Sequence, residues 1–172
     1  DTESVIAQKR LDDAGFRGVV IHLAGPLAGI SVRGHRLVCG GGASLPRAVL
    51  RAAKNGLTGI EFGASIPGTV GGAVAMNAGA YGGEIKDVLE WAVVCTASER
   101  RRMSLDELSF AYRSSAVAAH QVVTTVCFRL HPGERNVIDA TLADYRLHRR
   151  TTQPQGARTF GSVFTNPANE SA

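Results

Sequence analysis

The chain has 172 residues, which is the size of a single domain and is long enough to bury a hydrophobic core. Hydrophobic residues make up 44% of it and charged residues 20%, which excludes a disordered or fibrous protein. The net charge of +4 is scattered, apart from two short arginine runs at 100–102 and 149–150 that carry no interleaved aromatic residues, so we expect no nucleic-acid partner.

Strands and helices are expected to mix without regular strand–helix–strand alternation, which favours an α+β fold. Runs of apolar and β-branched residues predict strands at 18–23, 28–33, 36–40, 90–96 and 122–130. The strands at 28–33 and 36–40 are expected to pair through a turn at Gly34. Helices are predicted at 2–11, 44–55 and 137–151, and a short capped turn at 104–108, where Ser104 and Glu107 have capping-box spacing.

The clearest helix is the one over 44–55. Ser44 is its expected N-cap, and Gly56 can end it. Its buried face is predicted to be formed by Leu45, Val49, Leu50 and Ala53. Two aromatic residues in the later strands, Trp91 and Phe128, are expected to be core residues.

The three cysteines and five histidines suggest neither a disulfide framework nor a metal site. The cysteines are widely spaced, with no Cys-x-x-Cys pair, and lie in apolar strand-like runs. We therefore expect reduced, buried thiols and a cytoplasmic location. The histidines lack ligand spacing, so no metal is expected. No apolar run approaches the roughly 20 residues that a membrane helix needs, so we expect no membrane association.

The most informative stretch is residues 59–83, called the glycine-rich segment below, which holds eight of the 20 glycines. Small residues let backbone N–H groups approach phosphate or ring oxygens closely. The spacing fits neither the P-loop nor the G-x-G-x-x-G pattern. Contact with a nucleotide or flavin is the functional interpretation, and a tightly packed turn is the structural alternative.

Four stretches of the chain, taken in order, resemble motifs of one enzyme family. They read DDAGFRGVVIHL at 12–23, EFGASIPGTVGGAVAMNAGAYGGEI at 61–85, LSFAYRSS at 108–115 and RTTQPQGARTFGSVFTNP at 150–167. Together they resemble the UDP-N-acetylenolpyruvoylglucosamine reductases, which are flavoenzymes of peptidoglycan precursor synthesis. The resemblance covers about residues 12–168.

This resemblance implies a non-Rossmann FAD-binding α+β fold of the vanillyl-alcohol-oxidase and peptidoglycan-reductase type. It implies FAD as cofactor and NADPH as hydride donor. The substrate would be UDP-N-acetylglucosamine enolpyruvate, which is reduced to UDP-N-acetylmuramate, and we expect a monomer.

The resemblance also assigns roles to individual residues. Arg113 matches the family arginine near the substrate carboxylate, and a guanidinium there could stabilise the enolate formed after hydride addition. Ser162 matches the family proton donor. Tyr112 and Asn166 would contact substrate. The expected FAD contacts are Ser65, Ile66, Pro67, Gly68, Thr69, Gly71, Gly72, Asn77, Gly79 and Tyr81.

Two parts of the family pattern have no match in this chain. The Gly-Gly-Gly-Ser-Asn loop that wraps the FAD pyrophosphate is missing before Asp12, and the substrate domain that supplies a catalytic glutamate is missing after Asn166-Pro167. We therefore expect 1–150 to be an incomplete FAD-binding region and 151–172 to begin the substrate-binding domain. The alternative hypothesis is a non-catalytic relative or fragment that binds UDP-sugar or a protein partner.

Overall fold

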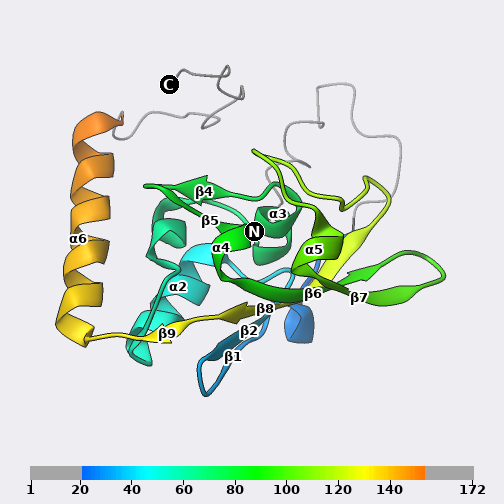
Figure 1. Ribbon diagram of the computed structural model, residues 1–172, viewed down its shortest axis with the longest axis horizontal. Coiled ribbons are helices and arrows are strands. Elements are labelled where there is room, and N and C mark those ends of the chain that lie inside the picture. The colour runs from blue at the N-terminus through cyan, green and yellow to red at the C-terminus, as the bar shows by residue number, and fades with distance from the viewer. Residues whose placement is uncertain (1–20, 154–172) are drawn as a thin grey trace.

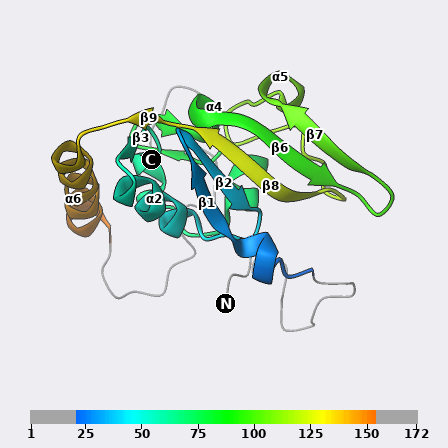
Figure 2. The ribbon, with the colours of Figure 1, turned by 90° about the horizontal axis from the view of Figure 1, so that it is seen from below.

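The computed structural model of the chain describes residues 21–153. Its centre is a five-stranded antiparallel sheet with the order β1-β2-β8-β6-β7, and the strands lie side by side in that order in Figure 2. The five strands are β1 (Ile30–Arg33), β2 (Arg36–Gly40), β6 (Leu89–Cys95), β7 (Arg100–Ser104) and β8 (Val122–Arg129).

The shorter α-helices lie over one face of this sheet, and the long C-terminal helix stands to one side of them, as Figure 1 shows. The α-helices are α2 (Leu45–Lys54), α3 (Val70–Ala75), α4 (Ile85–Val88), α5 (Leu105–Leu108) and α6 (Arg135–Thr152). Two 3-10 turns are η1 (Gly25–Ala28) and η2 (Glu61–Ser65). The remaining strands form two-residue pairs: β3 (Leu57–Thr58) with β9 (His131–Pro132), and β4 (Gly79–Ala80) with β5 (Gly83–Glu84). The mixture of antiparallel strands and helices confirms the expected α+β class.

The core lies between the sheet and helices α2 and α3. Alternate residues of β2 and β8 point inward, and Leu37, Cys39, Val126 and Phe128 are fully buried. They pack in one cluster with apolar residues of the two helices, such as Val49. Replacing a buried phenylalanine such as Phe128 with alanine costs roughly 3–5 kcal/mol, so this layer fixes the platform on which the glycine-rich segment lies.

Most predicted elements are present. The pair at 28–33 and 36–40 is β1 and β2, joined at Gly34, whose φ of +57° suits glycine. The predicted helix at 44–55 is α2, and the one at 137–151 is α6. The capped turn is α5, in which Ser104 and Glu107 form both reciprocal hydrogen bonds of a capping box. The expected helix at 2–11 lies outside the described residues.

Several local expectations were wrong. Residues 21–23, the described part of the expected strand at 18–23, are in no strand. Ser44 occupies the predicted N-cap position, although its side chain makes no cap hydrogen bond. Leu50 is 41% exposed, whereas Ala48 and Ala52 are fully buried on the inward face of the helix. Trp91 is only half-buried, and the Arg102 guanidinium lies 4.3 Å from its ring centroid.

No helix among residues 21–153 is both long and apolar enough to span a membrane. The three cysteines are free, with Cys39 and Cys127 buried as expected and Cys95 half-buried.

Candidate functional site

The glycine-rich segment folds into a turn, a short helix and a hairpin. After η2, Gly68 takes a φ of +129°, and Thr69 then caps α3 by accepting a hydrogen bond from the N–H of Gly72 at 3.2 Å. A non-glycine residue rarely adopts the Gly68 conformation, which explains glycine at this turn. The chain then returns through β4 and β5. The segment is held in shape by this cap and by backbone hydrogen bonds of Gly68, Val70 and Gly71 to residues 41–45.

Most of the residues expected to contact FAD are accessible. Pro67 is exposed, and the following are half-buried: Ser65, Ile66, Gly68, Thr69, Gly72, Gly79 and Tyr81. Gly71 is buried instead. A Cβ at Gly71 would lie 3.0 Å from the carbonyl oxygens of both Gly41 and Val123, so glycine here lets α3 approach the sheet.

Asn77 is the most buried polar residue of the segment, at 0% exposed. Its Nδ2 donates to Glu84 Oε2 and to the carbonyl oxygen of Ala111, both at 3.0 Å, and its Oδ1 accepts from the N–H of Lys86 at 3.1 Å. Its φ of +43° is a conformation that asparagine tolerates better than most residues. Asn77 therefore joins the β4–β5 hairpin to the loop before Arg113 from inside the protein.

Arg113 lies directly against the glycine-rich segment. Its Nη2 donates to the carbonyl oxygen of Gly79 at 2.9 Å, and its Nη1 contacts the carbonyl oxygen of Asn77 at 3.5 Å. The guanidinium carries more N–H donors than these two contacts use. The tertiary structure thus brings together two predicted motifs that are more than 30 residues apart in the chain.

The two predicted tyrosines lie in different surroundings. Tyr112 is 51% exposed, and the Arg113 guanidinium lies 5.1 Å from its ring centroid. Tyr81 is half-buried and turned toward α6, where its ring stacks on that of Tyr145 with centroids 4.1 Å apart. Tyr81 also donates from its hydroxyl to the backbone carbonyl oxygen of Tyr145 at 3.1 Å.

Backbone strain gathers at the predicted site. Among residues 21–153, four non-glycine residues have a positive φ, and three of them are Asn77, Tyr81 and Arg113. Such conformations cost of order 1–3 kcal/mol each and persist only where surrounding contacts fix them. The hydrogen bonds and ring contacts described above hold all three residues in these conformations.

Glu84 supplies the negative charge at the base of the hairpin. A hydrogen bond from Lys86 is the main cause that lowers the pKa of the Glu84 carboxyl, although partial burial opposes it. The amide of Asn77 and the charges of Lys86 and Arg113 lower it further. The carboxylate is therefore ionised at neutral pH, where it holds the Asn77 amide in place.

The accessible part of the segment suits a flat ring system. Backbone and small side chains dominate it, so a planar group can approach the peptide units closely. Gly68 and Gly72 are half-buried and carry no side chain, whereas a Cβ at Gly79 would lie 2.6 Å from the carbonyl oxygen of Gly83. These residues are chemically compatible with a flavin, and the described cysteines, histidines and acids include no group of three that could hold a metal ion.

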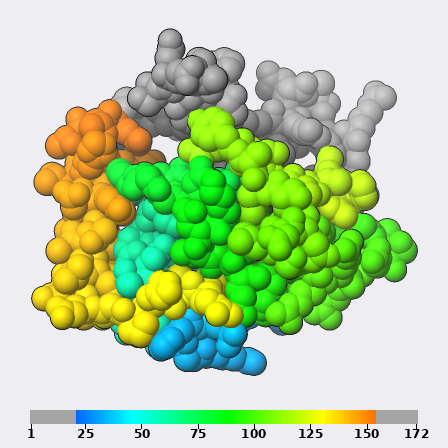
Figure 3. Space-filling model, in the orientation of Figure 1, coloured from blue at the N-terminus to red at the C-terminus, as the bar shows by residue number. Residues whose placement is uncertain are grey.

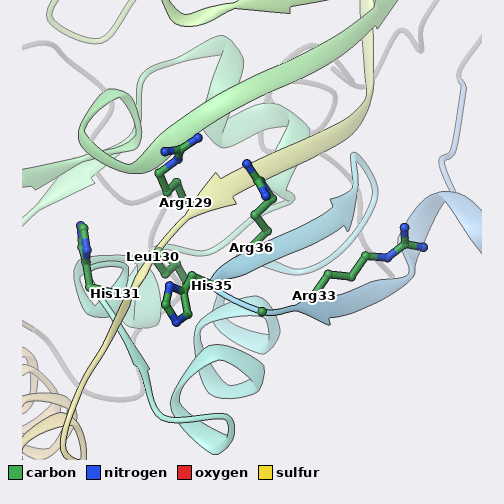
Figure 4. A pocket seen from close by; sticks show the side chains of 7 residues that line it. Arg33, His35, Arg36, Arg129, Leu130 and His131 are labelled. Atoms are coloured by element: carbon green, nitrogen blue, oxygen red, sulfur yellow. The ribbon is translucent and has the colours of Figure 1, made fainter.

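A separate basic hollow of about 450 Å³ lies at the β1–β2 turn, away from the glycine-rich segment, and is shown in Figure 4. Arg36 and Arg129 point the same way there, while Arg33 points away from them. Both Arg36 and Arg129 are ion-paired to Glu90, at 2.8 and 3.2 Å. The charges of these two arginines are therefore already paired within the protein.

Sequence reasoning missed the residues that support the site from outside the recognised motifs. Phe62 packs under the hairpin, since a Cβ at Gly83 would lie 2.7 Å from its ring. Tyr145 and Arg149 reach the segment from α6. The spacing of Ile138, Leu142, Tyr145 and Arg149, which follows one helical face, is the signal that could have found the last two. Ser162 and Asn166 lie outside the described residues.

Comparison with known proteins places this geometry in a family. Residues 7–102, more than half of the chain, match a family described as FAD binding domain. The reductase of Gluconobacter oxydans named UDP-N-acetylenolpyruvoylglucosamine reductase is 47% identical over 161 residues, or 93% of this chain and 53% of that protein. The protein of the same name from Acidiphilium cryptum is 43% identical over 93% of this chain and 52% of its own length.

A solved structure agrees with these matches. The crystal structure of UDP-N-acetylenolpyruvylglucosamine reductase from Thermus caldophilus is similar with a TM-score of 0.73 and 34% sequence identity, covering 88% of this chain and 53% of that one. The chain thus spans about half the length of the curated relatives it matches. It belongs to the FAD-binding-domain family, as a relative of the UDP-N-acetylenolpyruvoylglucosamine reductases.

Proposed function

We propose that this chain is the FAD-binding part of a reductase that converts UDP-N-acetylglucosamine enolpyruvate to UDP-N-acetylmuramate with NADPH as the electron source. In this proposal 1–150 hold the cofactor, 151–172 begin the substrate-binding domain, and the protein acts as a cytoplasmic monomer. Bound FAD would supply hydride transfer from NADPH to the enol ether of the substrate. The chain's own residues bind and orient the reactants.

The observation that most supports this proposal is the contact between Arg113 and the glycine-rich segment. Residues 65–69, 72 and 79, which are exposed or half-buried, form what we call the accessible strip. The hydrogen bond of 2.9 Å from Arg113 Nη2 to the carbonyl oxygen of Gly79 fixes a cation at the edge of this strip. Its unused N–H donors can receive the carboxylate of an enolpyruvyl group. The Arg113 guanidinium and the surface proposed to bind the flavin ring then lie side by side. Reduction of a double bond that carries a carboxylate requires this arrangement.

Arg113 would act on the developing negative charge. Hydride addition to one carbon of the enol ether leaves electron density on the adjacent carbon and the carboxylate, as an enolate. A guanidinium already oriented by two backbone carbonyls stabilises that charge without reorganising. The φ of +54° at Arg113 and the buried Asn77 beneath it maintain this orientation.

Other residues have proposed roles that follow from the family motifs. Ser162 would donate the proton that completes the reduction, and Asn166 would contact the substrate. Tyr112, exposed beside the guanidinium, would contact the substrate as well. Ser65, Ile66, Pro67, Gly68, Thr69, Gly72 and Gly79 would contact FAD, whereas Gly71, Asn77 and Tyr81 would support that surface through the contacts described above.

Cofactor binding and reduction can be tested separately. The visible absorption spectrum of the purified chain, followed by titration with FAD, reports binding directly. Single-turnover reduction of the enolpyruvyl substrate is then followed at the flavin band in the full-length reductase that contains this chain. In that protein Arg113→Ala should slow flavin reoxidation by the substrate about 10²-fold or more, because one preorganised charge contact is lost.

A matched control and two contrary outcomes complete the test. Arg33→Ala removes an exposed arginine at the β1–β2 turn and should leave both measurements unchanged. Wild-type rates in Arg113→Ala would remove the proposed role of this residue. If neither this chain nor the full-length protein binds FAD, but UDP-sugar still binds, the result would support the alternative of a non-catalytic relative.

A further inference from the structure

Helix α6, which is distant in the sequence, contacts the glycine-rich segment at Ser65 and again at Tyr81. Near its C-terminal end, Arg149 Nη1 donates to the carbonyl oxygen of Ser65. One turn earlier, Tyr145 stacks on Tyr81, with the rings 7° from parallel, and accepts the Tyr81 hydroxyl on its backbone carbonyl. His148 adds an edge contact to the Tyr81 ring, with centroids 5.7 Å apart. One helix therefore holds both ends of the stretch 65–81.

These contacts continue a single face of α6. Ile138 and Leu142 are buried and anchor the first half of the helix to the core. Tyr145 and Arg149 follow at the next positions of the same face and are half-buried. No residue of α6 after Leu142 is fully buried. The second half of the helix is thus held to the protein by polar and aromatic contacts with the segment and not by core packing.

The position of α6 fits this arrangement. In Figure 3 the helix runs along one side of the molecule, beside the atoms of α2 and of the glycine-rich segment. Tyr81 has a φ of +53°, and its ring contacts those of Tyr145 and His148 on the helix. A strained tyrosine conformation with three aromatic and hydrogen-bond contacts is a position that the surrounding structure specifies.

We propose that Tyr81, Tyr145 and Arg149 form a clamp that sets the spacing between the two ends of the stretch 65–81 and so shapes the surface that binds FAD. This inference rests on the proposed function of that surface. In it Tyr81, Tyr145 and Arg149 are positioning residues: they touch one another or the Ser65 carbonyl, and they act on the cofactor through the backbone they hold.

The clamp itself is tested by amide hydrogen exchange, followed by mass spectrometry. Arg149→Ala removes one contact, and Tyr145→Ala removes the stacked ring. Each should speed exchange in residues 143–152 about tenfold, while residues 135–142, anchored by Ile138 and Leu142, keep their protection. Arg146→Ala is the matched control, because Arg146 is exposed on the same helix. Tyr81→Phe removes only the hydroxyl hydrogen bond and should give a smaller effect than Tyr81→Ala.

The effect on the cofactor surface is tested by FAD titration of the same variants, using quenching of flavin fluorescence. Arg149→Ala and Tyr145→Ala should raise the Kd for FAD about tenfold, which corresponds to about 1.4 kcal/mol. Arg149→Lys should recover part of the loss, and Arg146→Ala should bind as the wild type does. The wavelength of the bound flavin absorption band should shift in the weakened variants.

Each remaining outcome counts against the proposal in a distinct way. Unchanged exchange in 143–152 would mean that no clamp exists. Faster exchange with an unchanged Kd would make the contacts architectural, without influence on the cofactor. If the wild type binds no FAD in the full-length protein, the proposed function fails together with the cofactor part of this inference, whereas the exchange result alone would still report whether α6 is held by these residues.

Discussion

Asn77 donates a hydrogen bond to Glu84 Oε2 across the base of the β4–β5 hairpin, at 3.0 Å. The same amide group also reaches the Ala111 carbonyl oxygen, two residues before Arg113. One buried side chain thereby joins the hairpin that follows α3 to the loop that carries the proposed substrate-binding arginine. The position of Arg113 therefore depends on Asn77, a residue that the family motifs alone assign to contact with the cofactor.

Replacing Asn77 with alanine should destabilise the fold strongly. The substitution takes the Asn77 partner from the Lys86 N–H and removes one of the two contacts made by both the Ala111 carbonyl oxygen and Glu84 Oε2. It also places alanine at a φ of +43°. We expect a loss of roughly 2–4 kcal/mol in the free energy of unfolding, measured by urea denaturation. Asn55→Ala, which removes one exposed hydrogen bond to the Arg51 carbonyl, should cost at most about 1 kcal/mol. Similar losses in both variants would show that Asn77 has no special structural role.

Adjacent glycines of α3 should respond differently to alanine. At Gly71 the new methyl group would press on two backbone carbonyl oxygens at 3.0 Å, so Gly71→Ala should lower stability by about 1–3 kcal/mol. At Gly72 the nearest atom is Thr69 Oγ1 at 3.3 Å, and alanine favours a helix, so stability should change by less than about 1 kcal/mol.

The same two substitutions, Gly71→Ala and Gly72→Ala, distinguish a role in packing from contact with the cofactor. Gly72 is half-buried on the accessible strip, so Gly72→Ala should weaken FAD binding while leaving thermal unfolding of the cofactor-free protein nearly unchanged. An unchanged Kd for FAD in Gly72→Ala would place the flavin away from the N-terminal turn of α3.

Acid should weaken the ion pairs that Glu90 makes across the three inner strands of the sheet, β2, β8 and β6. Hydrogen bonds from Arg36 and then Arg129, together with their charges, lower the pKa of the Glu90 carboxyl from 4.5 to about 2, against a smaller opposing effect of desolvation. Because the folded-state pKa is the lower one, these ion pairs stabilise the fold above pH 4.5. The stabilisation disappears as pH falls from 4.5 toward 2.

Urea unfolding at a series of pH values measures this dependence. Glu90→Gln should lose stability relative to the wild type at neutral pH, and the difference between the two proteins should shrink as the pH falls through that range. Glu99→Gln, at an exposed position of the β6–β7 hairpin, is the control and should track the wild type throughout. A constant difference between Glu90→Gln and the wild type across the range would contradict the assignment.

The three thiols should differ in reactivity. Burial, with a smaller contribution from the nearby Cys127, raises the pKa of the Cys39 thiol to about 12, and burial also raises the pKa of Cys127. Cys39 pairs with Val126 in the register, so the side chains of Cys39 and Cys127 lie on opposite faces of the sheet. Iodoacetamide near neutral pH should therefore modify Cys95 first, as peptide mass spectrometry would show, with all three modified in denaturant. Early labelling of Cys39 would indicate opening of the core.

Local sequence was a good guide wherever neighbouring residues decide the structure. The capping box of Ser104 and Glu107, the turn at Gly34 and the helix over Leu45–Lys54 depend on backbone preferences and on the spacing of apolar residues within a few positions. The recognised motifs also identified the FAD-binding family, because runs of small residues in a fixed order are specific. Leu50 shows the limit of this reasoning: an apolar residue at a helical spacing still faces solvent when alanines fill the narrow space beneath the helix.

The sequence by itself therefore determined the α+β class, the main elements, the FAD-binding family and the residue types available for chemistry. Only the tertiary structure decided which of those residues are free to act. It buried Asn77 and Gly71 as supports, turned Tyr81 toward Tyr145, and placed Arg113 against the carbonyl oxygen of Gly79. The physical reason is that such roles depend on contacts between segments more than 30 residues apart, and no local preference encodes the packing that brings them together.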